Sequence, residues 1–390
     1  MIAVELREIK ESEIGKVKEL RDYAFRVPAS GGEDDFNYWV QNARRLGLFY
    51  GEHLLAQVLT YPLSVSILGE RFSMGGIAYV ASFPEFRNGG LITRLMTESL
   101  VRMRDAGQLV SYLSPFSIPF YRRFGYEVFT EKVELEIPSH ALPDMGTVPG
   151  RVMRLTSKDG TGISVVRELY NRLALTKKSG MMMRDDAWWL RLARRGYTKE
   201  IAVYCDMNGV TMGYMLFTLD AEVFKVHEMV TLNYEAEKGL WRFIGTHGMM
   251  VDRVVAKNVG SLRDVSLAFP SPDFQKREIL DFMMRIVDVE AFLSKYRFEW
   301  TDNALYLQVE DEIAPWNEGV FEIRGSFVKR VESTKEPVLA ITIQALGQML
   351  MGFARPRDLV HYEKAQGSDI TVEAWEKAIP HVRSDFYDAF

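Results

Sequence analysis

The sequence predicts an α/β protein in which two related α/β units, each a sheet with flanking helices, precede a C-terminal unit of the α+β type. Three observations support this prediction. One order of elements occurs twice along the chain, two proline-rich stretches interrupt it, and alternating strand patterns dominate its last third. A chain of 390 residues is also too long for one ordinary hydrophobic core.

Two stretches mark the joints between these units. Residues 137–150 contain three prolines and two glycines with almost no hydrophobic periodicity, and residues 269–274 form a second cluster of proline and serine. They divide the chain into segments 1–138, 150–283 and 284–390, which we expect to be its domains.

The first segment begins with two helical patterns, at residues 17–27 and 36–47. Strand patterns follow at residues 48–68 and 72–83, and a pair of glycines then leads into an amphipathic helix. Arg44, Arg45 and Gly47 are expected to end the second helix, because basic residues and glycine favour helix C-termini.

The second segment repeats this order of elements, and Arg194, Arg195 and Gly196 again close its second helix. The copies differ after the last strand, where the first has PEFRNGGLITRLM and the second has EAEKGLWRFIGTH. The second copy keeps only Gly239 and has no proline or arginine at the matching positions. If the glycine loop carries chemistry, we expect only the first copy to do so.

The third segment starts with the apolar residues 280–293. Strand patterns follow at residues 297–302, 304–311 and 319–325, and helical patterns end the chain. We expect an antiparallel sheet here. The apolar residues 337–354 are interrupted by Gln and Gly and predict a strand and a helix, not a membrane span.

Composition narrows the class of protein. The chain is 47% hydrophobic and 26% charged with a net charge of −5, which argues against binding to nucleic acid through phosphate contacts. Its one cysteine, Cys205, allows no intrachain disulfide, and the N-terminus is charged from the start. We expect a cytoplasmic protein. The six histidines are scattered, so no metal site is expected.

The glycine loop has two interpretations. Gly89 and Gly90 leave the backbone N–H groups of the next helix open to an anion, and Arg87 supplies a positive charge. The alternative is a tight turn that needs glycine for its backbone angles. Neither a Walker loop nor a dinucleotide fingerprint is present, so a pyrophosphate bound here belongs to another cofactor.

A resemblance supports the first interpretation. The run VASFPEFRNGGL at residues 80–91, followed by Phe120, Tyr121, Gly125 and Tyr126, resembles the GNAT superfamily of acetyl-CoA-dependent N-acetyltransferases. It departs at Ile92, where that family has a small residue, and the Ile92 side chain can face the helix core. The resemblance implies acetyl-CoA as co-substrate, held by Val80, Ala81, Ser82, Arg87, Asn88, Gly89, Gly90 and Leu91.

The layout of the whole chain is similar to the Eis (enhanced intracellular survival) acetyltransferases. They combine an active GNAT domain, a degenerate one and a sterol-carrier-like domain. This resemblance implies direct acetyl transfer to small cationic amines such as aminoglycosides, at more than one position, by a homo-hexamer. It also implies Tyr121 as general acid and the terminal carboxylate of Phe390 as general base. Packing under the sheet is the alternative role of Tyr121.

The position of the amine pocket follows from the same resemblance. Phe25, Glu33, Tyr38 and Trp39 lie where such proteins line it, although acidic residues there are equally typical of an ordinary helix start. Two other functions stay open. One is acetylation of proteins or peptides, and the other is non-catalytic binding of an acyl-CoA or lipid, with residues 338–352 lining one side of a tunnel.

Overall fold

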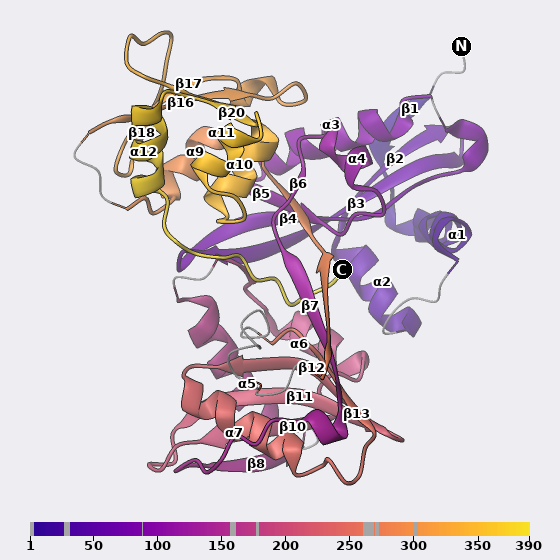
Figure 1. The fold of residues 1–390 in the computed structure, drawn as a ribbon. Coiled ribbons are helices and arrows are strands. Elements are labelled where there is room, and N and C mark those ends of the chain that lie inside the picture. The colour runs from indigo at the N-terminus through magenta and orange to yellow at the C-terminus, as the bar shows by residue number, and fades with distance from the viewer. Residues whose placement is uncertain are drawn as a thin grey trace. The chain divides into compact units, whose positions relative to one another are not determined.

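The fold is taken from a computed structural model, which describes residues 4–26, 32–87, 89–156, 161–176, 179–259, 269, 273–299 and 303–390. The chain forms two compact units (Figure 1). Unit 1 comprises Met1–Thr130, Lys177–Met183 and Asp281–Phe390, and unit 2 comprises Glu131–Thr176 and Arg184–Leu280. The first and third predicted segments thus pack within one unit.

A mixed sheet forms the centre of unit 1. Its strand order is β1 (Glu5–Glu8), β2 (Arg44–Tyr50), β3 (His53–Ile67), β4 (Glu70–Ser82), β5 (Val110–Leu113), β15 (Met283–Ile286) and β6 (Glu127–Val128), with β9 (Ser179–Met182) on β3. Only the β4–β5 pair is parallel. β9 therefore comes from the sequence of the predicted second segment, and β15 lies at the boundary between the second and the third. β7 (Glu131–Pro138), expected in the first segment, joins the sheet of unit 2.

Helices from the first predicted segment lie on both sides of this sheet. In Figure 1, α3 (Leu91–Asp105) and α4 (Ile118–Arg122) lie on one side of it, and α1 (Ile14–Phe25) and α2 (Gly32–Asn42) on the other. The predicted apolar face of α3 is buried, with Leu95, Met96, Leu100 and Met103 in the core. Short 3₁₀ turns occur at η1 (Glu11–Glu13), η2 (Pro84–Phe86), η3 (Ser139–Ala141) and η6 (Pro315–Asn317).

The predicted end of the second helix is wrong by a few residues. α2 ends at Asn42, and Arg44, Arg45 and Gly47 start strand β2 instead. Pairing with β1 and β3 outweighs the local helix pattern. The expected contact of a basic residue with the helix C-terminus is still present. The Arg45 guanidinium donates to the carbonyl oxygens of Val40 and Gln41 at 2.7 and 2.8 Å.

Unit 2 is also built around a mixed sheet with accompanying helices. The strand order is β14 (Gln275–Leu280), β7, β13 (Arg253–Lys257), β12 (Val223–Thr231), β11 (Thr211–Asp220), β10 (Glu200–Cys205) and β8 (Arg151–Thr156). Its helices are α5 (Thr161–Ala174), α6 (Asp186–Arg194) and α7 (Tyr234–Gly245). The helix end predicted at Arg194–Gly196 is confirmed, with Gly196 at φ +79°.

The C-terminal part of unit 1 has a third sheet, ordered β18 (Phe327–Val331), β17 (Gly319–Arg324), β16 (Leu305–Glu310), β19 (Leu339–Thr342) and β20 (Ala365–Gln366). β16 and β19 are parallel, so the expectation of a purely antiparallel sheet was wrong. Residues 297–299 form no strand, and residues 300–302 lie outside the described residues. The helices are α9 (Val289–Lys295), α10 (Ile343–Leu350), α11 (Pro356–His361) and α12 (Asp369–Ala378).

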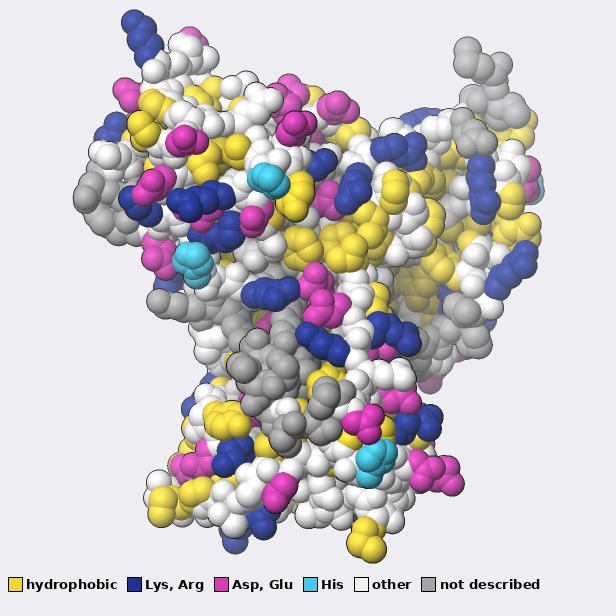
Figure 2. Space-filling model, viewed as in Figure 1, with side chains coloured by type: hydrophobic (Ala, Val, Ile, Leu, Met, Phe, Trp, Pro, Cys, Tyr) yellow, Lys and Arg dark blue, Asp and Glu magenta, His cyan; other side chains and the backbone are white. Residues whose placement is uncertain are grey.

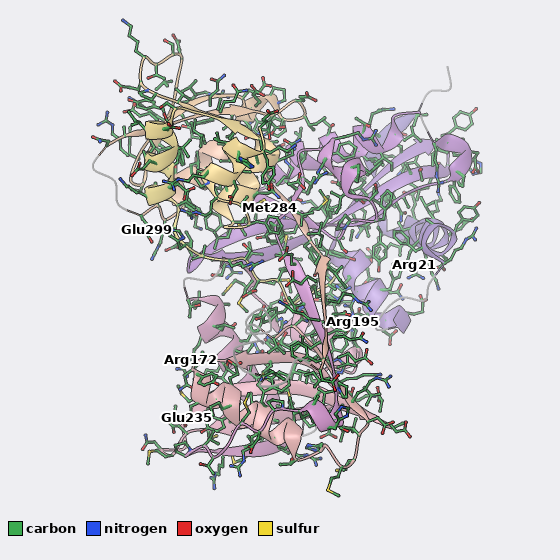
Figure 3. All side chains as sticks on the ribbon, in the orientation of Figure 1. Arg21, Arg172, Arg195, Glu235, Met284 and Glu299 are labelled. Atoms are coloured by element: carbon green, nitrogen blue, oxygen red, sulfur yellow. The ribbon has the colours of Figure 1, made fainter. Side chains whose placement is uncertain are left out.

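Helix α10 joins this third sheet to the first. It packs on β15 and β6, where Gln344 and Gln348 donate to the carbonyl oxygens of Arg122 and Val128, both at 2.9 Å. Its Gly347 lies against Met284 of β15, the residue labelled in Figure 3. The apolar side chains of α10 are therefore used in packing inside unit 1.

Candidate functional site

The candidate site begins where strands β4 and β5 part. Met74, Gly75 and Gly76 pair with Val110, Ser111 and Tyr112, and no described strand pairs with β4 beyond Gly76 on that side. β4 nevertheless runs on to Ser82, held by β3 alone. The predicted residues Val80, Ala81 and Ser82 lie on this one-sided stretch, where backbone groups facing β5 can bind an amide-bearing chain.

A bulge interrupts the one-sided stretch of β4. The pairing shifts register between Gln57 and Leu59, and Tyr79 adopts φ +49°. A residue with a side chain costs about 1–2 kcal/mol in this left-handed region, so its surroundings must stabilise it. The Tyr79 ring packs edge-on with Phe36 of α2 at 5.5 Å and with Phe25 of α1 at 5.9 Å. These helices therefore hold the bulge.

Helix α3 starts next to the one-sided stretch, and its first turn is open. Its N-cap residue, Gly90, has φ +70° and offers no side-chain cap, and the first turn contains no acidic residue. An added Cβ at Gly90 would meet nothing within 4 Å, and one at Gly89 would meet only the Phe86 carbonyl oxygen at 3.6 Å. Bare N–H groups at such a helix end attract an anion.

The other residues of the loop are consistent with this geometry. Arg87 is exposed just after the turn η2, while Leu91 and Ile92 pack on the core beside α3. The expectation that Ile92 faces the core is confirmed. Asn88, also predicted here, lies outside the described residues. Gly90 adopts a positive φ and also leaves an open approach, so the geometry is compatible with either interpretation of the glycine pair.

The same place in unit 2 is closed. Helix α7 is capped by Asn233, whose side chain accepts from the N–H of Ala236 at 2.9 Å, and its first turn carries Glu235, labelled in Figure 3, and Glu237. β12 and β13 also stay together beyond Val226 and Ala256, the last residues of their ladder, because Met229 N donates to the Asn258 oxygen at 3.1 Å and Met229 bridges to Val259. Acids and an occupied cap disfavour an anion there.

Tyr121 lies in α4 on the core side of the first sheet. It is 4% exposed, in a ring cluster with Phe116, Phe120 and Tyr126 at 5.1–6.3 Å. Burial raises the pKa of the Tyr121 hydroxyl well above its usual value, so the hydroxyl keeps its proton and can donate it. Both roles foreseen for Tyr121, packing and proton donation, are compatible with this position.

The neighbour of Tyr121 ties this cluster to the strand pair. Tyr126 Oη lies 2.7 Å from Ser111 Oγ, and Ser111 Oγ donates to the Gly75 carbonyl oxygen at 2.8 Å. Burial raises the pKa of Tyr126 to about 12. The last paired residues of β4 and β5 are thus held by a buried hydrogen-bond chain.

Phe390 lies at the same strand pair. An added Cβ on Gly76 would come 3.0 Å from the Phe390 ring, which also lies against Phe282 at 5.4 Å and Tyr61 at 6.1 Å. The last residue of the chain, more than 300 positions away in sequence, therefore sits at the last paired residue of β4.

The four residues predicted for an amine pocket have different environments. Phe25 packs on the bulge at Tyr79, and Trp39, 5% exposed, packs on Tyr61 at 5.4 Å. Tyr38 is 38% exposed. Glu33 pairs with Lys18 at 2.9 Å and Arg21 at 3.5 Å, and Lys18 is the main reason that the pKa of Glu33 is lowered.

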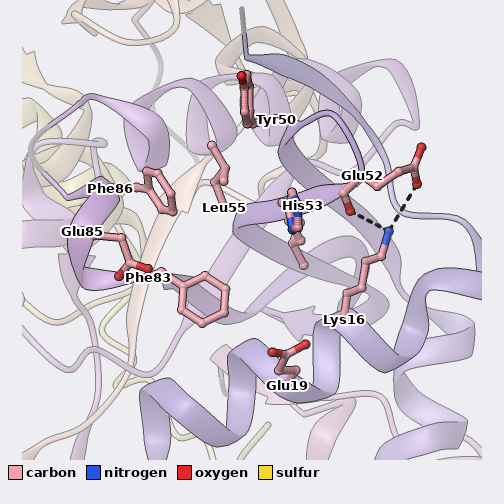
Figure 4. A pocket seen from close by; sticks show the side chains of 10 residues that line it. Lys16, Glu19, Tyr50, Glu52, His53, Leu55, Phe83, Glu85 and Phe86 are labelled. Carbon is pink, nitrogen blue, oxygen red and sulfur yellow. Dashed lines mark hydrogen bonds and ion pairs between the residues drawn. The ribbon is translucent and has the colours of Figure 1, made fainter. Parts of the chain in front are cut away.

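A groove that the sequence did not predict opens beside the end of β4 (Figure 4). It has a volume of about 490 Å³. Three carboxylates, four aromatic rings including the His53 imidazole, and one lysine contribute to it, and we call it the acidic groove. Its lining residues are Lys16, Glu19, Tyr50, Glu52, His53, Leu54, Leu55, Phe83, Glu85 and Phe86.

The acidic groove carries a negative charge. Lys16 Nζ lies 3.0 Å from Glu13 and 3.5 Å from Glu52, so its charge is already neutralised. Glu19 and Glu85 form no ion pair with another described residue. Carboxylates beside aromatic rings favour an organic cation. The lining comes from three separate stretches of the sequence, and none of them has a local motif that could have revealed it.

Further observations concern metal binding, membrane-spanning helices and surface charge. Within the ranges that the structure covers, no three His, Cys, Asp or Glu side chains are grouped so that they could hold a metal ion. None of the described helices combines the length and hydropathy that a membrane crossing requires. On the face drawn in Figure 2, basic and acidic side chains are interspersed.

The chain matches known domain families in three ranges. Residues 5–129 and 180–286 each match an acetyltransferase (GNAT) domain, and residues 289–386 match a sterol carrier protein domain. An uncharacterized N-acetyltransferase of Streptomyces avermitilis is 25% identical over 264 residues, which are 62% of this chain and 63% of that protein.

Solved structures match over the full length. A conserved Enterococcus faecalis V583 protein of unknown function, described as a probable N-acyltransferase, has a TM-score of 0.88 and 28% identity, with both chains covered completely. Eis1 from Mycobacterium abscessus has a TM-score of 0.81 and 19% identity, again with 100% of both chains covered. The second comparison establishes a shared fold over the whole chain.

Proposed function

Since the chain is a GNAT N-acetyltransferase with two GNAT domains and a C-terminal sterol carrier protein domain, we propose that it transfers acetyl from acetyl-CoA to primary amines of small cationic molecules. Transfer is direct, within a ternary complex, and takes place in the first GNAT domain. Acetylation at more than one amine of one substrate, as on an aminoglycoside-like molecule, is part of the proposal.

One observation carries the proposal: among the described residues, the first GNAT domain combines separated strands with an uncapped helix start, and the second does not. The pyrophosphate of the donor would bind at Arg87, Gly89, Gly90 and the N–H groups that begin at Leu91. Its pantetheine arm would take the place of the missing strand beside Val80, Ala81 and Ser82. The predicted Asn88 belongs to the same loop.

The reaction needs two proton transfers. The amine nitrogen attacks the thioester carbon, the carbon–sulfur bond breaks, and Tyr121 gives its proton to the departing sulfur. The proton lost by the amine passes through water to the Phe390 carboxylate. A free α-carboxyl has a pKa of about 3.3–3.7, so its main effect is to hold the ammonium close while the proton leaves. Backbone donors of β4 stabilise the oxyanion.

The charge of the acidic groove supports a cationic acceptor. Phe83 directly follows the one-sided stretch of β4 and lines the acidic groove. Its ring packs on the Tyr23 ring at 5.4 Å. In this proposal, amines remote from the reacting one bind at Glu19, Glu52 and Glu85. Phe25, Glu33, Tyr38 and Trp39 remain our proposal for the wall around the reacting amine. Because Glu33 is paired with Lys18 and Arg21, its contribution would be the smallest of these.

Two alternative functions can be distinguished from the proposed one. Acetylation of proteins or peptides would use the same donor site and differ in the acceptor. Non-catalytic binding of an acyl-CoA or lipid has less support, because the residues proposed for a tunnel wall form β19 and α10, which are largely buried in packing. A cytoplasmic location fits the donor and the single cysteine.

Self-association as a homo-hexamer is also proposed. Its support is a set of highly exposed apolar side chains in unit 2, namely Met207, Tyr234, Met249 and Met250. Light scattering should give six times the 44.8 kDa of one chain. The mass of a single chain would contradict it.

The proposed function is tested by coenzyme A release from acetyl-CoA over a panel of monoamines, polyamines, aminoglycosides and lysine peptides. We expect turnover with polycationic small molecules above that with peptides. The same panel is run on a chain extended by one glycine after Phe390, where we expect turnover to collapse. Equal turnover in the extended chain would remove Phe390 as base. Donor binding without turnover of any amine would contradict the enzymatic function.

A further inference from the structure

The last nine residues of the chain run over three glycines that come from different parts of the sequence. An added Cβ at Gly352 would lie 2.1 Å from the Val382 carbonyl oxygen. One at Gly180 of β9 would lie 3.1 Å from the Asp385 carbonyl oxygen and 3.4 Å from Ser384 Cβ. Distances this short show that the tail lies on bare backbone at each point.

Side-chain contacts fix the tail between these glycines. Ser384 Oγ donates to the Met351 carbonyl oxygen. Phe386, 5% exposed, packs on Phe282 at 4.5 Å and on Tyr112 at 5.6 Å. Tyr112 is the β5 residue that pairs with Gly76, so the tail is anchored directly beside the parting strands.

The third contact is the closest to the site. An added Cβ at Gly76 would come within 3.0 and 3.1 Å of the Phe390 ring and 3.1 Å of Leu63. The backbone of Gly76 is outside the positive-φ region, so its conformation suits any residue. Contact with the ring, not backbone strain, is what requires glycine here.

We propose that Gly76 is a positioning residue, which together with Gly180 and Gly352 forms a seat that sets where Phe390 lies at the β4–β5 opening. The inference rests on the proposed function, because it assigns Gly76 an effect on catalysis that acts through Phe390. A methyl group at residue 76 displaces the ring by a few tenths of an ångström and shifts the backbone attached to it.

The neighbouring glycine provides a matched control. An added Cβ at Gly75 would meet the Met103 side chain at 2.6 Å, on the α3 side of the sheet, and its three nearest neighbouring atoms all belong to Met103. Gly75→Ala and Gly76→Ala thus add the same methyl to adjacent positions of one strand. Only the second change reaches the tail.

The experiment compares Gly76→Ala and Gly75→Ala, each with Phe390 and with Phe390→Leu, whose smaller side chain relieves the contact. We expect Gly76→Ala to lower kcat about tenfold or more with little change in the KM for acetyl-CoA, because small misplacements of a reacting group slow a reaction strongly. Phe390→Leu should restore most of that loss, and any loss in Gly75→Ala should not be restored.

Hydrogen exchange of residues 384–390 gives a readout without turnover. We expect faster exchange in Gly76→Ala, recovery when Phe390→Leu is added, and no change in Gly75→Ala. Normal kcat and normal exchange in Gly76→Ala would overturn the proposal, and so would a loss that Phe390→Leu does not restore. If the unmodified protein acetylates no amine, the exchange result still decides whether the seat exists.

Discussion

At the scale of single residues, burial determines what Tyr121 can do. Because burial raises its pKa, the hydroxyl still carries its proton at about pH 10.4, where a primary amine such as that of lysine is half neutral. We predict that Tyr121→Phe lowers kcat about 10²- to 10⁴-fold and changes the KM for acetyl-CoA little.

The control for this variant is Tyr296→Phe. Tyr296 is also a buried tyrosine with a raised pKa, but its hydroxyl donates to the Leu350 carbonyl oxygen in the C-terminal part of unit 1. Its replacement should affect stability alone. Steady-state kinetics that give both variants the same kcat would contradict an acid role for Tyr121.

Glu13 is a second residue whose environment makes a pH-dependent prediction. Its hydrogen bonds with Arg7 at 2.7 and 2.9 Å are the main cause of its lowered pKa, and Lys10 N and Lys16 contribute. A lowered pKa stabilises the fold above the usual value of 4.5, and this stabilisation is lost as the pH falls below it.

We therefore predict that Glu13→Gln lowers the free energy of unfolding by about 1–3 kcal/mol at pH 7, since its bonds involve charged groups. The difference from the unmodified protein should shrink as the pH falls below 4.5. Urea unfolding at several pH values measures it, with the exposed Glu11→Gln as control. A difference that grows toward low pH would contradict the assignment.

Residue-scale prediction from the sequence succeeded where the requirement is local. Gly89, Gly90 and Ile92 could be placed because a helix start with adjacent glycines is visible in one short stretch. The roles of Gly76 and Tyr79 could not be predicted. They depend on contacts with Phe390 and Phe36, which lie far from them in the sequence. The carboxylates of the acidic groove were missed for the same reason.

At the scale of elements, the two GNAT domains differ in how the helix after the bulged strand begins. Asn233 caps α7, whereas Gly90 leaves α3 uncapped. We predict that Asn233→Ala destabilises unit 2 by about 1 kcal/mol, the usual effect of a lost N-cap, and leaves kcat and the KM for acetyl-CoA unchanged. Urea unfolding and kinetics check both parts. A raised KM would place a donor site in the second GNAT domain.

Hydrophobic periodicity located several helices, and α1, α3 and α6 lie close to where it placed them. Strand partners were harder to predict, because pairing is decided by contacts between distant segments. β15 inserts between β5 and β6, and β19 runs parallel to β16, although neither segment differs locally from an ordinary antiparallel strand. The three segments expected from the sequence stay a prediction, since the compact units combine the first with the third.

At the scale of the whole molecule, the chain carries two copies of one fold but, in our account, one donor site. Duplication usually keeps the architecture because it is needed for stability, while a site survives only where its geometry is kept. In the second copy the strands are bridged and the helix is capped. The C-terminal part contributes α10, β15 and Phe390 to the surroundings of the first copy.

Acetyl-CoA binding, measured by isothermal titration calorimetry, tests the single-site account most directly. We predict one acetyl-CoA per 44.8 kDa chain. Gly90→Ala should weaken binding about tenfold or more, while Gly107→Ala should not, although both glycines flank α3 near φ +70° with open space around them. Two acetyl-CoA molecules per chain, or equal affinities in these variants, would contradict the account.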